Sequence, residues 1–114
     1  MTTLIVRRKG TSIQGLSLSG HSGFAPNGSD IVCAAISTLI TVCANALESV
    51  ADVRAEIRQD EENAVIELML PEALAEKAMY DAQIILRTVV QGFEDIGKEY
   101  PKYLKIIDGR QLSC

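Results

Sequence analysis

An uncharged stretch in the first half of the chain constrains the fold more than any other feature of the sequence. Residues 31–47 carry no charge, and Asp30 and Glu48 flank them. A stretch of this length is near the lower limit for a helix that crosses a membrane. Its polar members are Ser37, Thr38, Thr41 and Asn45. Because these residues and the flanking charges fit a globular protein better than a bilayer, we expect a largely buried helix from Asp30 to about residue 49, and no membrane partner.

Alternating apolar residues and turn residues predict strands on both sides of this helix. One strand is expected to begin at Leu4 and a second to span residues 12–19. The alternation of the second strand slips at Gly15, where we expect a β-bulge. After the helix, residues 53–58 and 64–70 alternate on either side of a polar turn, which is typical of a β-hairpin.

A second helix and a last strand complete the predicted order. Pro71 suits the first position of a helix because its missing amide costs little there, and Pro101 ends that helix. The apolar stripe at helical spacing comprises Leu74, Ala78, Ala82, Ile85, Val89, Phe93 and Ile96. A short strand follows at residues 104–107. The order β-β-α-β-β-α-β predicts an α+β fold, one domain over residues 1–114, in which two helices pack on one face of a small, mainly antiparallel sheet.

Charge and cysteine content limit the partners and the compartment. The formal net charge is -4, and the one basic cluster, residues 7–9, is short and is expected to be the solvated end of a strand, so no direct nucleic-acid partner is expected. Three cysteines without close spacing do not make a disulfide framework, and they indicate a reducing compartment such as the cytoplasm. The basic residues at positions 7–9 follow the first apolar residues rather than precede them, so no signal peptide is expected.

One pair of residues carries the chemistry of a nucleophile and its base. Cys33 lies three residues after Asp30, the expected N-cap, so it is expected in the first helical turn. There the unpaired amides and the helix dipole favour a thiolate, and the same amides could donate to an oxyanion. His21, the single histidine, could take the thiol proton and return it to a leaving group. A glycine-rich loop lies between the two residues and could let the chain double back.

Each of these residues also has a simpler interpretation. A cysteine is often a small buried hydrophobe, and a loop histidine is often just exposed. Asp30 either only caps the helix or also orients His21, as the third member of a triad does. Ser37, one turn beyond Cys33 on the same side, either bonds to substrate or the loop, or bonds to the carbonyl one turn back. A single histidine with scattered cysteines does not give the paired ligands of a zinc site, so no metal and no cofactor are expected.

Two adjacent motifs resemble a known family. Residues 20–23 read Gly-His-Ser-Gly, and residues 28–37 read Gly-Ser-Asp-Ile-Val-Cys-Ala-Ala-Ile-Ser. This pattern closely resembles the bacterial ribosomal-processing cysteine proteases called Prp, over essentially the whole chain. The sequence differs at Ser22, where that family often has alanine.

The resemblance implies a function and roles for particular residues. It implies a homodimeric endopeptidase that removes a short N-terminal extension from the large-subunit ribosomal protein numbered twenty-seven. His21 would be the base and Cys33 the nucleophile. Asp30 and Ser37 occupy positions that look functional in the family, and Gly20 and Gly28 match its loop glycines. Two rivals remain open: a ribosome-assembly module that binds the same partner without cutting it, and a thiol-based sensor.

Overall fold

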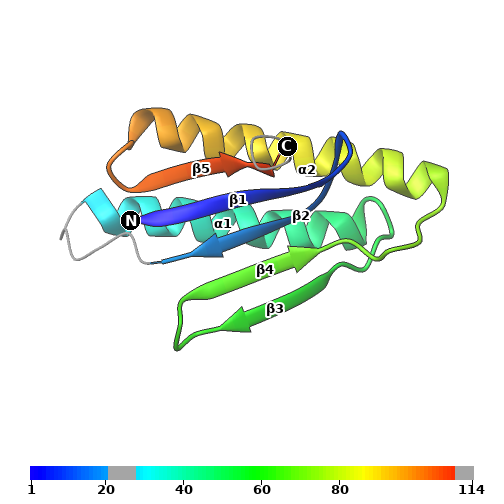
Figure 1. The fold of residues 1–114 in the computed structure, drawn as a ribbon, viewed down its shortest axis with the longest axis horizontal. Helices are drawn as coiled ribbons and strands as arrows, with labels where there is room; N and C mark the ends of the chain where they lie inside the picture. The colour runs from blue at the N-terminus through cyan, green and yellow to red at the C-terminus, as the bar shows by residue number, and fades with distance from the viewer. Residues whose placement is uncertain (21–27, 110–114) are drawn as a thin grey trace.

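Strands and helices follow one another in the predicted order. The structure, a computed structural model, describes residues 1–20 and 28–109, and of residues 28–30 only the backbone. The elements are β1 (Thr2–Lys9), β2 (Ser12–Ser19), α1 (Gly28–Ser49), β3 (Glu56–Asp60), β4 (Val65–Met69), α2 (Glu76–Glu99) and β5 (Leu104–Asp108). Figure 1 shows both helices on the same face of the sheet. The predicted α+β fold is confirmed.

The five strands form one mixed sheet in the order β3-β4-β2-β1-β5. The pairs β1–β2, β2–β4 and β3–β4 are antiparallel, and only the pair β1–β5 is parallel. A bulge interrupts β2, because Arg7 pairs with Gly15 while Arg8 pairs with Ile13, which leaves Gln14 as the extra residue. The sequence predicted this bulge at Gly15, one residue further along β2. A Cβ at Gly15 would collide with Leu68 and Met69 of β4, so the close approach of β4 requires glycine there.

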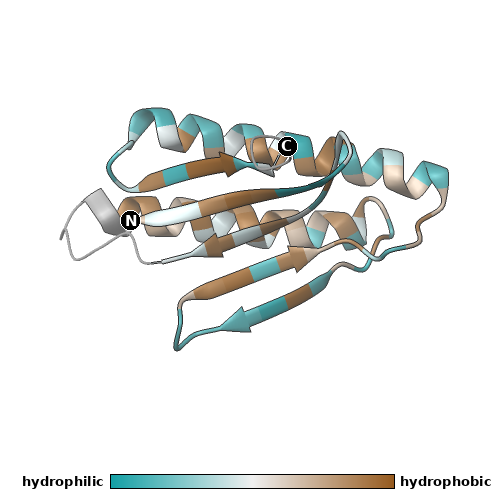
Figure 2. Cartoon of the chain, viewed as in Figure 1, coloured by the Kyte–Doolittle hydropathy of each residue, from teal (hydrophilic) through white to brown (hydrophobic). Residues whose placement is uncertain are grey.

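The core lies between the sheet and the two helices. The buried residues of α1 are Val32, Ile36, Ile40, Cys43 and Leu47. Those of α2 are Ala82, Leu86, Val89, Val90 and Phe93. Both sets recur at the three- and four-residue spacing that keeps side chains on one face of a helix. Figure 2 shows the hydrophobic colour concentrated on the inner strands and on α1, and the hydrophilic colour on much of α2 and β3.

The prediction that α1 is largely buried was wrong. One stripe of α1 contacts the core, but Ile31 and Val42 on its outer face are 59% and 49% exposed. The sheet and α2 can cover only one side of a helix that lies at the edge of the helical layer. By length and composition alone, the part of α1 from Ile31 to Ser49 could cross a membrane, a test that core helices of soluble proteins also pass.

Two element boundaries were predicted too early. β3 begins at Glu56 rather than at residue 53. The chain at residue 53 still contacts α1, because Val53 is buried and its amide donates to the carbonyl of Leu47 at 2.8 Å. α2 begins at Glu76 rather than at Pro71. Residues 71–75 instead carry the chain from the sheet to the helical layer. The second helix ends at Glu99, before Pro101, as predicted.

Candidate active site

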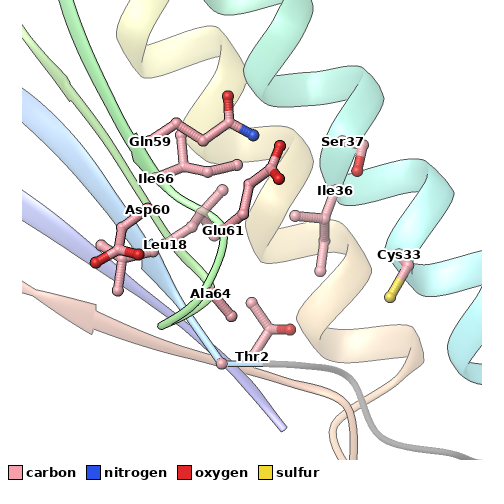
Figure 3. Close-up of a pocket in the computed structure, with 12 residues that line it drawn as sticks. Thr2, Leu18, Cys33, Ile36, Ser37, Gln59, Asp60, Glu61, Ala64 and Ile66 are labelled. Atoms are coloured by element: carbon pink, nitrogen blue, oxygen red, sulfur yellow. The ribbon is translucent and has the colours of Figure 1, made fainter.

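A pocket of about 160 Å³ lies between the first turns of α1 and the turn of the β3–β4 hairpin. It is lined by residues from both helix and sheet: Thr2, Leu18, Gly20, Cys33, Ile36, Ser37, Gln59, Asp60, Glu61, Ala64, Val65 and Ile66. Figure 3 shows Cys33, Ile36 and Ser37 projecting from α1, and Gln59 and Glu61 reaching toward the helix from the hairpin. Three of the predicted site residues, Gly20, Cys33 and Ser37, therefore meet in one pocket.

Cys33 presents its thiol at the surface rather than in the core. Its neighbour Val32 is fully buried and Ile36 is 7% exposed, while Cys33 itself is exposed. The interpretation of Cys33 as a small buried hydrophobe is therefore wrong. Cys43, ten residues further along the same helix, shows that alternative: it is fully buried, and burial raises the pKa of its thiol to about 12.

The position of Cys33 along α1 differs from the prediction. The helix begins at Gly28, two residues earlier than expected, so Cys33 is its sixth residue and lies in the second turn. At 1.5 Å rise per residue, its Cα is about 7.5 Å along the axis from the first helical residue. Helical side chains lean toward the amino terminus, so the sulfur leans back toward the unpaired amides. The dipole stabilises a thiolate less there than in the first turn.

Asp30 is not the N-cap of α1. It is the third residue of the helix, whereas an N-cap residue stands just before the first helical residue. The prediction was wrong because residues 28 and 29 are themselves helical. A carboxylate in the first turn still interacts favourably with the helix dipole.

Ser37 lies one turn beyond Cys33 and lines the same pocket, as predicted from its spacing. The hydroxyl of the neighbouring Thr38 donates to the carbonyl of Ala34, one turn back, at 2.8 Å. Ser37 is exposed to solvent where it lines the pocket.

Gly20 closes the end of the pocket where β2 stops. Its amide donates to the carbonyl of Ala64 at 3.0 Å, which ties the end of β2 to the turn of the hairpin. Its φ of +88° is in the region that favours glycine, and an added Cβ would lie 2.5 Å from the carbonyl oxygen of Met1. Gly28 is the first residue of α1. His21 and Ser22 lie outside the described residues.

The hairpin wall of the pocket was missed by the sequence prediction. The polar turn of the predicted hairpin was given no functional role, yet Asp60 and Glu61 both line the pocket. The side chain and the amide of Asn63 donate to the Asp60 carboxylate, at 2.7 and 3.1 Å, and these bonds hold the pKa of Asp60 below its usual value. One wall of the pocket is therefore negatively charged at neutral pH.

The composition of this site fits acyl-transfer chemistry at a thiol better than metal chemistry. Within residues 1–20 and 28–109, no three His, Cys, Asp or Glu side chains come together in a way that could hold a metal ion. The pocket combines an exposed thiol, a helix start whose first amides have no acceptor within the helix, and a hydroxyl one turn away. A thiol nucleophile with nearby oxyanion donors is the arrangement that cysteine hydrolases use.

Comparison with known proteins agrees with this chemistry. The family model described as cysteine protease Prp matches residues 1–105. A curated relative from Bacillus subtilis (strain 168), named ribosomal processing cysteine protease Prp, is 26% identical over 102 residues, which cover 90% of this chain and 91% of that protein.

Solved structures share the fold over nearly the whole chain. The crystal structure of SMU.848 from Streptococcus mutans has a TM-score of 0.76 and 32% identity, over 94% of this chain and 92% of that one. The structure of Prp from S. aureus with a substrate peptide has a TM-score of 0.80 and 21% identity, over 95% and 99% of the two chains.

The site and the fold together define a cysteine protease, a peptide hydrolase that uses a thiol as its nucleophile. The chain belongs to the Prp family of ribosomal-processing cysteine proteases, as its two motifs suggested.

We expect Gly20→Ala to be more destabilising than Gly10→Ala. Both glycines have a positive φ, but only at Gly20 would a Cβ press on the backbone of Met1, while nothing lies within 4 Å of one at Gly10. An alanine at a positive φ costs about 1–3 kcal/mol of stability at each site, and the collision with Met1 adds a further cost only at Gly20. Urea denaturation of both variants measures the difference. Equal losses would contradict a tight fit at the end of β2.

We also expect the two cysteines of α1 to react very differently with iodoacetamide. In a Cys114→Ser background at pH 8, Cys33 should be alkylated in the folded protein, because it is exposed. Cys43 should react only in denaturant, because it is buried and its pKa of about 12 keeps it a neutral thiol. Peptide mapping by mass spectrometry over time measures both rates. Alkylation of Cys43 as fast as Cys33 in the folded protein would be the contrary result.

Proposed function

We propose that this protein removes a short N-terminal extension from the large-subunit ribosomal protein numbered twenty-seven, with Cys33 as nucleophile and His21 as general base. The observation that carries the proposal is the exposed Cys33 thiol at a pocket whose other end is Gly20, the residue immediately before His21 in the sequence. The name of the B. subtilis relative supports a ribosomal substrate. The S. aureus protein has been solved with a substrate peptide and with a covalently linked product peptide, which supports a peptide ligand and a covalent step.

The reaction begins with transfer of the Cys33 proton to His21. The thiolate attacks the scissile carbonyl carbon, and the carbon–sulfur bond forms as the carbonyl π electrons move to oxygen. The amides of the first turn of α1 have no acceptor within the helix, and they are the proposed donors to this oxyanion. The imidazolium of His21 then protonates the departing amine as the carbon–nitrogen bond breaks, which leaves a thioester on Cys33.

Water completes the cycle. His21 takes a proton from a water molecule, the resulting hydroxide attacks the thioester carbonyl, and the carbon–sulfur bond breaks. The extension peptide leaves with a new carboxylate, and the proton on His21 returns to Cys33. No metal or cofactor takes part.

The remaining predicted residues have supporting roles in this proposal. Asp30 orients His21, and the start of α1 at Gly28 supports this role because it removes the need for Asp30 as a cap. Ser37 donates its hydroxyl to the backbone of the bound peptide at the mouth of the pocket. Gly20 and Gly28 flank the segment that carries His21, and neither has a side chain that would crowd a peptide.

Cys33→Ala and His21→Ala should each reduce cleavage of the extension by at least about a thousandfold, because each removes a group on which covalent catalysis depends. The measurement is mass spectrometry of an extended substrate peptide after incubation with each variant. Thr88→Ala, on the exposed side of α2, is a control that should cleave like the wild-type protein. Full activity in Cys33→Ala would end the proposal. Binding of the peptide without cleavage by the wild-type protein would favour the assembly module, and rapid alkylation without turnover would favour the sensor.

We further propose that the protein acts as a cytoplasmic homodimer in which the outer face of α1 contacts its partner. Ile31 and Val42 are exposed on this face, and Ala34 and Thr38 between them are small enough for two helices to approach closely. An exposed apolar stripe on a long helix is typical of a contact between subunits.

Val42→Asp should therefore convert the dimer to a monomer, because it would bury a carboxylate at the contact. Sedimentation velocity measures the mass of both forms. Ile84→Asp is the matched control, since Ile84 is an aliphatic residue of similar exposure on α2, and it should leave the mass unchanged. A wild-type protein that sediments as a monomer would refute the dimer.

A further inference from the structure

A second, larger hollow continues the active-site pocket along α1. It has a volume of about 360 Å³ and lies between α1 and the face of the hairpin that is turned toward the helix. The two hollows share the walls Ser37, Gln59 and Ile66. They therefore form one groove that starts at Cys33 and follows the helix. We call the part beyond Ser37 the distal groove.

The floor of the distal groove is aliphatic and its rim is polar. Ile40, Ala44, Ile57 and Leu68 line its floor, and Thr41 and Asn45 stand on the helical rim. A concave apolar surface with a few polar groups at its edge is typical of a site that binds a ligand side chain. The lining contains no charged residue, in contrast to the active-site pocket with Asp60 and Glu61.

The topology of the sheet leaves this groove open. β3 is an edge strand, and every one of its residues is exposed. Ile57 lines the groove and is still 51% exposed, so an aliphatic side chain next to other aliphatic side chains is left half in water. A bound apolar group would remove that surface from water, which favours occupation of the groove.

The length of the groove matches a short stretch of extended peptide. Thr41 is eight residues beyond Cys33, which corresponds to about 12 Å along the helix axis. An extended peptide advances about 3.3 Å per residue, so about three or four residues cover that distance. A peptide whose scissile bond lies at Cys33 can therefore run along α1 and place a side chain in the distal groove.

We propose that the distal groove is a specificity subsite that binds an apolar side chain of the peptide substrate, two to four residues from the scissile bond. The inference rests on the proposed function. Ile57 and Ala44 are the specificity-determining contacts, and Thr41 stands at the entrance. The continuity of the groove with the Cys33 pocket favours the substrate as the occupant over a second copy of this chain.

The test is a change of specificity by charge. In the extended substrate peptide, each residue within four positions of the scissile bond is replaced by lysine in turn, and kcat/KM is measured for the wild-type protein and for Thr41→Asp. For the wild-type protein, kcat/KM should fall at least about tenfold when lysine stands at one of these positions, because an apolar side chain no longer enters the groove. With that lysine peptide, kcat/KM of Thr41→Asp should be several-fold higher than that of the wild-type protein, since the new carboxylate pairs with the ammonium group. With the original peptide, kcat/KM of Thr41→Asp should be several-fold lower than that of the wild-type protein.

A matched variant and a second substitution make the result specific. Thr88→Asp adds the same charge in place of the same residue on the exposed side of α2, and it should behave like the wild-type protein with every peptide. Ile57→Ala removes the floor and should lower kcat/KM for the original peptide, whereas Arg58→Ala, which does not line the groove, should not.

The outcomes separate this inference from the proposed function. If Cys33→Ala abolishes cleavage but Thr41→Asp has the same peptide preferences as the wild-type protein, the subsite is wrong and the protease function stands. If Thr41→Asp changes the sedimentation of the protein and not its preferences, a second copy occupies the groove and the subsite is again wrong. If Cys33→Ala still cleaves, the proposed function fails and the inference fails with it.

Discussion

The pairing of β2 between β1 and β4 is the constraint on which the rest of the structure depends. β2 is the central strand of the sheet, and its antiparallel partners on both sides are fixed in register. A slip by one residue would turn Leu16 and Leu18 from the core toward the opposite face, so the register is strongly specified. The bulge at Gln14 and the close approach of β4 at Gly15 fix that register locally.

This register also builds the pocket. Because β2 ends beside the turn that joins β3 to β4, the Gly20 amide reaches the Ala64 carbonyl, and the end of one strand is joined to the tip of a distant hairpin. The same arrangement sets the hairpin opposite the first turns of α1, where Cys33 and Ser37 face it. The pocket therefore follows from the sheet and not from any contact local to the segment around Cys33.

The two cysteines of α1 illustrate how one helix serves two purposes. Cys33 lines the pocket beside the hairpin and Cys43 lies in the core, because the ten-residue step from one to the other turns the side chain by only about 80° around the helix axis. The same thiol group is exposed in the first position and is kept neutral by burial in the second. Composition of the helix alone did not separate these faces, because apolar residues occur nearly all round it.

The sequence by itself determined the order of the elements, a bulge in β2 near Gly15, three of the five buried residues of α2 and the common side of α1 on which Cys33 and Ser37 lie, because each depends on spacing within a short segment. Tertiary structure decided the rest. The start of α1 at Gly28, the delayed start of α2 and the outer face of α1 depend on how segments meet, which local propensity does not encode. The acidic hairpin wall and the distal groove also join residues far apart in the chain. Their proximity comes from strand pairing and helix packing, and no spacing along the sequence contains it.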